Sequence, residues 1–291
     1  MSISREQFRS ILSRSACTPA APIFDPLSAR IADMLGWEVC KLSGSVGKFA
    51  NLAVPDSVPM SNMSDLVDLC WRINRVANVC LIADADEGGG NALNVMRTVR
   101  ELEAAGVSAI EIEDNLVPRR FGGATSRHSL MISKEEQVGK LRAAAAARRD
   151  STTVIVARTS ALAELPLDEA LDRIRAYSQT GAEAIMLPGV RRGRADIEAA
   201  RQATNLPLCV LGLPPDALND PAFLAANGVR IRFLGQPTYG MAVKAIYDSL
   251  KHLKEGGAPE ELRDRQAPAD LLRAVDRTEE LMRWEREYIR E

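Results

Sequence analysis

The chain has 291 residues, 46% of them hydrophobic, enough for one large α/β domain or two small ones with a sizeable core. Lys and Arg total 37 against 39 Asp and Glu, a net charge of −2 without blocks of like charge, which argues against nucleic-acid binding and favours a small-molecule partner. The five scattered cysteines and the absence of an apolar run of about 18 residues predict a cytoplasmic protein without a membrane partner.

Short apolar runs rich in branched residues recur along the chain at near-even intervals and are too short for helices. They predict buried strands at Ala20–Ile23, Val39–Leu42, Val79–Ala83, Ala109–Ile112, Val154–Ala157, Ala184–Leu187, Leu208–Leu211 and Val229–Phe233. Between them, apolar residues spaced by three and four predict helices at Ala92–Ala105, Lys134–Arg149, Leu167–Thr180 and Met241–Lys254. The helices before four of the strands are expected to end at Gly36, Gly106, Gly181 and Gly228.

About eight strand–helix units predict a single TIM-type (β/α)8 barrel over residues 1–255, with an open doubly wound sheet as the alternative. The glycine run Gly88–Gly90 fits neither the dinucleotide nor the Walker phosphate-loop pattern, which favours the barrel. The amphipathic pattern beyond Pro268 predicts that residues 256–291 form a helical extension, which packs on the barrel or on a partner subunit.

Polar residues stand where most of these strands end, and catalytic groups of such barrels gather at the carboxyl ends of the strands. The candidates are Ser43-Gly44-Ser45, Asp84 with Asp86, Glu113, Arg158 and Gln236. Converging carboxylates repel one another unless a cation lies among them, and oxygen ligands select a hard ion, Mg²⁺ or Mn²⁺. Zinc is disfavoured because the two histidines, His128 and His252, lie far from this cluster in sequence.

Each candidate also has a structural interpretation. Alternation along a strand would turn Asp84 and Asp86 to one side, but the two residues could instead cap the next helix. Arg158 suits a substrate carboxylate or a developing enolate oxygen, although Glu113 and Arg158 could form a purely structural ion pair. The triplet Ser43-Gly44-Ser45 can offer donors to an oxyanion or can simply form a tight turn.

Several segments resemble the isocitrate lyase/phosphoenolpyruvate mutase superfamily, over roughly residues 20–250. They are Phe24–Arg30, Ser43–Ser45, Asp84–Asp86 with Gly88–Asn91, Ile112–Asp114 and Ala157–Thr159. Within the superfamily the chain is most similar to the oxaloacetate decarboxylase branch, notably in Asp25–Ala32 and Asn91–Thr98.

The resemblance implies a homotetrameric barrel that exchanges a helix between subunits. It also implies Mg²⁺ bound directly by Asp84 with water-mediated support from Asp56, Asp86 and Glu113, and substrate contacts from Ser45 and Arg158. The implied reaction is decarboxylation of a small 2-keto acid, oxaloacetate to pyruvate and CO₂ as first choice, through a metal-stabilised enolate. Asp84 and Arg158 are then the catalytic residues.

Three positions depart from that branch and suggest an altered substrate pocket. Gln236 stands where the branch has a substrate-binding histidine, Glu87 replaces a histidine or threonine, and Gly89 replaces an aromatic residue. Glu87 disfavours a second anionic substrate group unless it turns away, and Gly89 is expected to open volume. The alternatives are therefore phosphonopyruvate mutase or hydrolase chemistry, a lyase for another 2-keto or 2-hydroxy diacid, and an inactive metal-binding barrel that serves as a scaffold.

Overall fold

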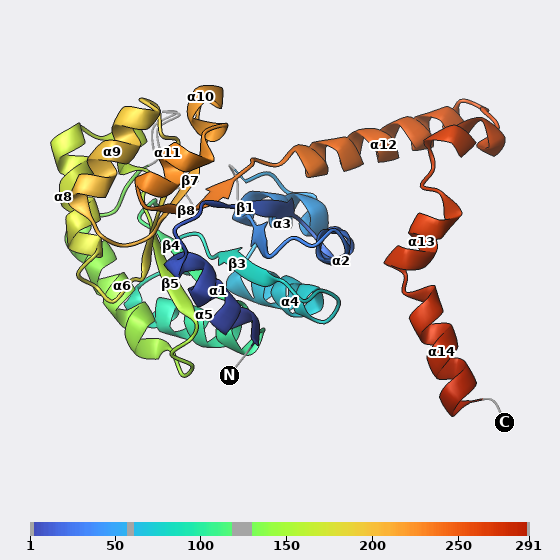
Figure 1. Cartoon of the computed structure of the whole chain (residues 1–291), viewed down its shortest axis with the longest axis horizontal. Coiled ribbons are helices and arrows are strands. Elements are labelled where there is room, and N and C mark those ends of the chain that lie inside the picture. Colours follow the sequence, from blue (N-terminus) through green and yellow to red (C-terminus); the bar gives the residue numbers. More distant parts are fainter. Residues whose placement is uncertain (1–2, 57–60, 118–129, 290–291) are drawn as a thin grey trace. The chain divides into compact units, whose positions relative to one another are not determined.

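A computed structural model describes residues 3–56, 61–117 and 130–289. Within the unit Met1–Gln236, eight parallel strands pair in chain order and close into a barrel (Figure 1). They are β1 (Thr18–Ile23), β2 (Val39–Leu42), β3 (Cys80–Asp84), β4 (Ala109–Glu113), β5 (Val154–Arg158), β6 (Ala184–Pro188), β7 (Leu208–Leu211) and β8 (Val229–Phe233). The predicted (β/α)8 barrel is confirmed, and the open-sheet alternative is wrong.

Helices alternate with the strands. They are α1 (Ile3–Ser13), α2 (Pro26–Met34), α3 (Gly44–Leu52), α4 (Met63–Asn74), α5 (Ala92–Ala104), α6 (Lys134–Ala147), α7 (Ala161–Glu164), α8 (Leu167–Tyr177), α9 (Arg194–Ala203), α10 (Pro215–Leu218) and α11 (Pro221–Ala226). Helices α6 and α8 end two and three residues earlier than the apolar pattern predicts, whereas the four expected glycine stops all adopt positive φ. A glycine stop ends each of these helices because a residue without Cβ adopts the left-handed conformation at little cost.

Alternating residues of the strands face two separate apolar cores. Ile110 and its equivalents face the surrounding helices, while Val39, Val154 and their equivalents fill the barrel interior. Helix α1 places Phe8 and Ile11 in the interior cluster, and its Arg9 Nε donates to the carbonyl of Thr152, two residues before β5 begins. Helix α1 therefore closes the amino end of the barrel, and the carboxyl end is the one available for a site.

Residues Pro237–Glu291 form a second, wholly helical unit. It contains α12 (Pro237–Lys254), a short 3₁₀ helix (Pro259–Arg265), α13 (Ala269–Val275) and α14 (Thr278–Tyr288). The division between the two units therefore falls at Gln236, before α12. The sequence predicted it at residue 255, after α12. None of the helices in the described ranges combines the length and apolar character needed to cross a membrane.

Candidate active site

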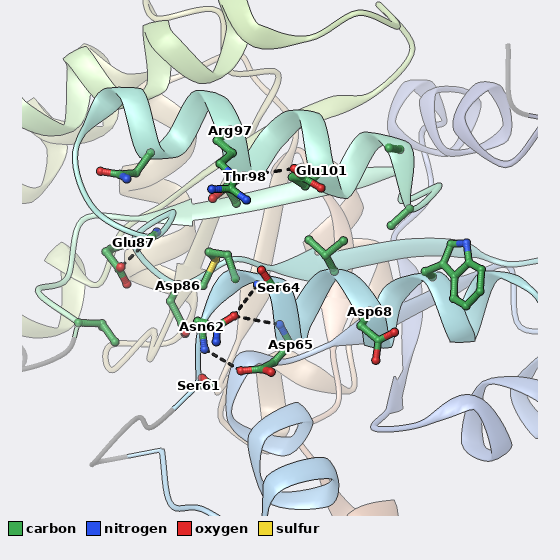
Figure 2. A pocket seen from close by; sticks show the side chains of 18 residues that line it. Ser61, Asn62, Ser64, Asp65, Asp68, Asp86, Glu87, Arg97, Thr98 and Glu101 are labelled. Carbon is green, nitrogen blue, oxygen red and sulfur yellow. Dashed lines mark hydrogen bonds and ion pairs between the residues drawn. The ribbon is translucent and has the colours of Figure 1, made fainter.

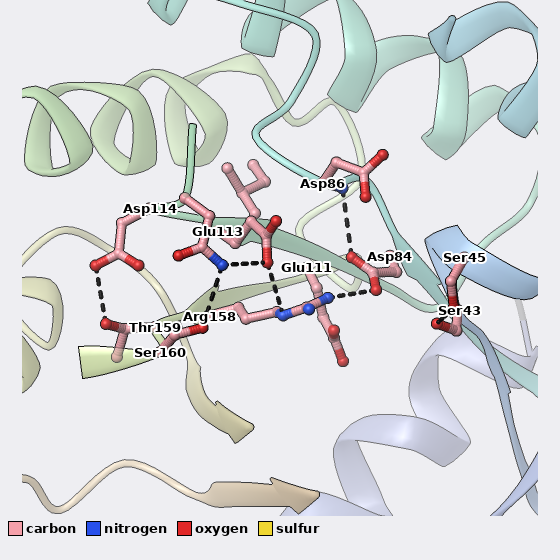
Figure 3. A network of polar contacts seen from close by, with 12 residues as sticks. Ser43, Ser45, Asp84, Asp86, Glu111, Glu113, Asp114, Arg158, Thr159 and Ser160 are labelled. Atoms are coloured by element: carbon pink, nitrogen blue, oxygen red, sulfur yellow. Dashed lines mark hydrogen bonds and ion pairs between the residues drawn. The ribbon is translucent and has the colours of Figure 1, made fainter. Parts of the chain in front are cut away.

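Charged side chains from three adjacent strands meet at the carboxyl end of the barrel (Figure 3). Asp84, Glu113 and Arg158 are the last residues of β3, β4 and β5. The Arg158 guanidinium forms an ion pair with Asp84, and its Nε lies 3.0 Å from Glu113 Oε2. The structure therefore brings these three predicted residues together, and the ion pair that the sequence offered as the structural interpretation is present.

Asp86 reaches the same cluster by a different route from the one predicted. Strand β3 ends at Asp84, and Asp86 lies in a turn with φ of 47°, so strand alternation does not orient it. Its backbone N–H nevertheless lies 3.3 Å from Asp84 Oδ1. A Cβ at Gly44 would come within 2.6 Å of Asp86 Oδ1, so glycine at position 44 permits this close approach. The helix-cap alternative is wrong, because Asn91 caps α5.

The triplet Ser43-Gly44-Ser45 begins helix α3 and is not an isolated tight turn. Ser43 is the N-cap residue, and its hydroxyl lies 3.1 Å from that of Ser45. The backbone N–H of Gly44 donates to the carboxylate of Asp84. Free N–H groups at the start of a helix favour negative charge, so this helix end complements the carboxylate cluster.

Lys48 is a member of this site that the sequence interpretation missed. Its buried Nζ lies 2.7 Å from Asp86 Oδ2 and 3.1 Å from Asp56 Oδ1. Asp56, whose side chain is 53% exposed, thus joins the cluster through Lys48. The available sequence signal was a lysine one turn into the helix that begins at Gly44.

Two further charged residues lie one layer deeper, inside the barrel. Lys41 of β2 and Glu111 of β4 form a buried ion pair, and Lys41 Nζ lies 3.8 Å from Asp84 Oδ2. Neither residue was predicted to belong to the site: Lys41 precedes the end of β2, and of the polar residues near the end of β4 only Glu113 was assigned a role. Their signal is a charged residue inside a buried strand, Lys41 in the middle of β2 and Glu111 in the middle of β4.

A second polar network supports the cluster from the side of α8. Buried Asp114 accepts hydrogen bonds from Thr159 Oγ1 at 2.8 Å and from the Tyr177 hydroxyl at 2.7 Å. The next residue, Asn115, donates from Nδ2 to Glu113 Oε2 at 3.1 Å. These bonds fix the carboxyl ends of β4 and β5 relative to each other and so hold Glu113 in place.

Burial and neighbouring charges shift the pKa values of the three carboxyl groups in different directions. Burial opposes ionisation of Asp84, but the positive charges of Arg158 and Lys41 hold its pKa below the usual range. Burial, with repulsion from Asp84 and Asp86, raises the pKa of Glu113 to about 7 although Arg158 opposes this shift. Burial and the charge of Asp84 also raise the pKa of Asp86.

The donor set suits a hard divalent cation. Asp84, Asp86 and Glu113 offer only oxygen atoms, and burial raises the pKa values of the last two even though Lys48 and Arg158 lie beside them. In the described ranges no three acidic, His or Cys side chains form a ready coordination group, and Arg158 lies between Asp84 and Glu113. Of the two histidines, His252 belongs to α12, and His128 lies outside the described residues.

A small cavity of about 40 Å³ opens beside Asp84 and Arg158 at the centre of the barrel. Lys41, Ser43 and Gln236 also line it. The buried Oε1 of Gln236 has no hydrogen-bond partner among the described residues, so it is available to a donor group of a ligand. The cavity has room for only a few water-sized molecules, which favours a small substrate.

A larger groove of about 940 Å³ lies outside the barrel between α4 and α5 (Figure 2). Glu87 lines this groove and not the small cavity, and its Oε1 accepts a hydrogen bond from Gly89 N–H at 3.1 Å. A Cβ at Gly89 would lie 2.8 Å from Met63 Cγ. Met63 therefore lies close to the space that a side chain at position 89 would take, and Gly89 lines the groove and not the small cavity.

A closed parallel barrel with carboxylates and a guanidinium at its carboxyl end belongs to the class of (β/α)8-barrel enzymes. Residues 8–254 match the family described as phosphoenolpyruvate phosphomutase, and the chain belongs to that family. The predicted superfamily is thereby confirmed.

Curated relatives and solved structures agree with this assignment. The chain is 42% identical over 276 residues to an oxaloacetate decarboxylase of Bradyrhizobium diazoefficiens, covering 95% of this chain and 93% of the relative. It is 39% identical over 285 residues to one of Paraburkholderia xenovorans, covering 98% and 93%. A phosphoenolpyruvate phosphomutase from Streptomyces platensis has a TM-score of 0.84 at 27% identity, covering 98% and 99% of the two chains. A phosphonopyruvate hydrolase in complex with oxalate and Mg²⁺ has a TM-score of 0.82 at 29% identity, again covering 98% and 99%.

Proposed function

We propose that this chain is a Mg²⁺-dependent carbon–carbon lyase that decarboxylates a small 2-keto acid, with oxaloacetate as the first choice. The observation that carries the proposal is the meeting of Asp84, Glu113 and Arg158 beside a small cavity at the carboxyl end of the barrel. The identity of about 42% to oxaloacetate decarboxylases selects this reaction among those of the family.

Asp84 would hold the metal ion directly, and Asp86, Glu113 and Asp56 would support it through water. When bound, Mg²⁺ supplies a Lewis acid for the keto acid. Manganese offers the same oxygen-seeking chemistry and is the expected substitute. Lys48 already connects Asp56 to Asp86, which explains how an exposed carboxylate takes part in a buried site.

Arg158, Ser45 and Gln236 would orient the substrate. The guanidinium of Arg158 donates to the carboxylate of the pyruvate-like end, and the hydroxyls of Ser43 and Ser45 with the N–H groups at the start of α3 complete its contacts. As the C–C bond to the departing CO₂ breaks, its electron pair moves toward the keto oxygen. Arg158 stabilises that charge more strongly than the ground state, and this difference lowers the barrier.

The proposal includes assembly into a cytoplasmic homotetramer that exchanges a helix between subunits. Helix α12 buries none of its residues in the single chain. Its exposed apolar side chains are Met241, Val243, Ile246, Tyr247, Leu250 and Leu253. Such a stripe is typical of a helix that packs against another surface, and light scattering of the purified protein would measure the number of subunits.

A panel assay tests the proposed reaction. Purified protein is incubated with oxaloacetate, phosphonopyruvate and other 2-keto or 2-hydroxy diacids, and release of pyruvate or phosphoenolpyruvate is measured with Mg²⁺ and with a chelator. Oxaloacetate is expected to give the fastest Mg²⁺-dependent release. Faster turnover of phosphonopyruvate would favour the chemistry of the hydrolase that the fold resembles. Oxalate binding without turnover of any panel member would instead support the scaffold alternative.

A further inference from the structure

The ion pair of Lys41 and Glu111 is unusual because of where it lies. Lys41 is 5% exposed and Glu111 is fully buried, and both point into the barrel interior. The interior residues around and below them are apolar, including Ile82, Val156 and Met186. Charged groups enter such a layer only at a cost in desolvation.

Stability alone does not explain the pair. A buried ion pair is commonly no better for stability than apolar residues of similar volume. This pair is also incompletely satisfied, because Glu111 Oε1 has no hydrogen-bond partner among the described residues. A pair that contributes little to folding is a candidate for a role in the adjacent site.

The ammonium group of Lys41 lies at the floor of the small cavity. Lys41 lines that cavity together with Arg158, and both cations approach the same oxygen, Asp84 Oδ2. An ammonium group has three N–H donors, and among the described residues Glu111 is the one close ion-pair partner of Lys41, since Asp84 Oδ2 is 3.8 Å away. Donor capacity therefore remains for a ligand in the cavity.

We infer that Lys41 is a further substrate-contacting residue, whose ammonium group binds a carboxylate or enolate oxygen of the small anionic substrate from the barrel interior. Glu111 is then a positioning residue, because its ion pair from β4 holds the ammonium group of Lys41 in place. Arg158 binds the anion from β5 and Lys41 binds it from β2 (Figure 3 shows Arg158, Asp84 and Glu111). This inference rests on the proposed function, since it specifies how that site holds a keto acid.

A double variant separates this role from a structural one. Lys41→Met with Glu111→Leu removes both charges at nearly constant volume, so the thermal unfolding temperature is expected to stay at or above that of the unaltered protein. Oxalate, a small dicarboxylate that mimics pyruvate enolate, serves as the probe, and calorimetry measures its binding in the presence of Mg²⁺. Oxalate should bind about tenfold more weakly or worse, as loss of one hydrogen bond between charged groups predicts.

Glu111→Gln alone is the matched control because it keeps the cation. The glutamine amide oxygen can still accept a hydrogen bond from Lys41 Nζ but carries no charge, so the oxalate affinity of Glu111→Gln is expected to lie between those of the unaltered protein and of the double variant. Equal oxalate affinity in the unaltered protein and the folded double variant would overturn the inference and leave a structural pair. A crystal structure of the unaltered protein with oxalate gives a second test that requires no variant. An oxalate oxygen within hydrogen-bond distance of Lys41 Nζ supports the contact, and a bound oxalate away from Lys41 overturns it.

The same measurements distinguish the two proposals. Oxalate binding does not require turnover, so an unaltered protein that binds oxalate but releases no pyruvate from oxaloacetate contradicts the proposed function and leaves the Lys41 comparison intact. An unaltered protein that turns over oxaloacetate while the double variant binds oxalate equally well contradicts only the inference about Lys41. Absence of any oxalate binding to the unaltered protein overturns that inference directly.

Discussion

The two ends of the barrel interior differ although the same eight strands build both. Toward the amino end, Val39, Val154 and the apolar side chains of α1 form a buried apolar core. Toward the carboxyl end, the inward-facing residues are charged. Along β4, for example, the inward-facing residues are Ala109, then Glu111 and then Glu113. One strand thus contributes stability at one end and chemistry at the other, because its inward residues are spaced by two.

Metal removal should have the largest effect on the charged end. Chelation is expected to lower pyruvate release from oxaloacetate by at least about a hundredfold, because loss of a Lewis acid leaves the developing charge to the protein side chains alone. The assay compares rates after dialysis against a chelator and after return of Mg²⁺ or Mn²⁺. Full activity without a divalent ion would remove the metal from the proposal.

Replacing Arg158 by alanine should have the next largest effect. Loss of one preorganised donor to the developing charge costs on the order of 3 kcal/mol, so turnover should fall about a hundredfold or more. Arg158→Lys is the control, since it keeps the charge but not the forked donor geometry, and it should retain part of the activity. Unchanged turnover in Arg158→Ala would show that the pairs with Asp84 and Glu113 are structural.

Gly44→Ala tests the charged end without removing a charge. The added Cβ would lie 2.6 Å from Asp86 Oδ1, so the Asp86 side chain must move. Mg²⁺-dependent turnover is expected to fall about tenfold, which corresponds to roughly 1.4 kcal/mol. The free energy of unfolding should change little, because Gly44 is the first residue of α3 and the added Cβ meets the end of a side chain and not backbone. Parallel loss of stability and activity would instead indicate a general packing defect in α3.

Ile110→Val probes the apolar side of the comparison and should have the smallest effect. Ile110 is fully buried and packs toward the helices, whereas its neighbour Glu111 faces the interior. Loss of one methylene should lower the free energy of unfolding by about 1 kcal/mol, as measured by urea denaturation. The turnover of the folded protein should stay the same. A marked loss of activity would mean that the two faces of β4 are not independent.

Sequence patterns predicted only some of the residues at the charged end of the barrel. The others were missed or misinterpreted because their positions depend on tertiary packing. Asp84, Glu113 and Arg158 were accessible to prediction because each directly ends an apolar strand. Lys48 was not, because its role depends on how α3 lies against the turn that holds Asp86. Strand alternation likewise gave the wrong reason for the position of Asp86, since that residue has a positive φ beyond the end of β3.

The amino-acid sequence by itself determined the eight strands, three of the longer helices between them and the four glycine stops, because these depend on local periodicity and backbone preference. It also determined the family, through short motifs around Asp84 and Arg158. Only the tertiary structure decided which charges meet. Lys41 and Glu111 lie 70 positions apart in the sequence and come together because closure of the barrel sets the relative heights of β2 and β4. Periodicity reports which face a side chain occupies, but the partner on that face is fixed by the register between strands.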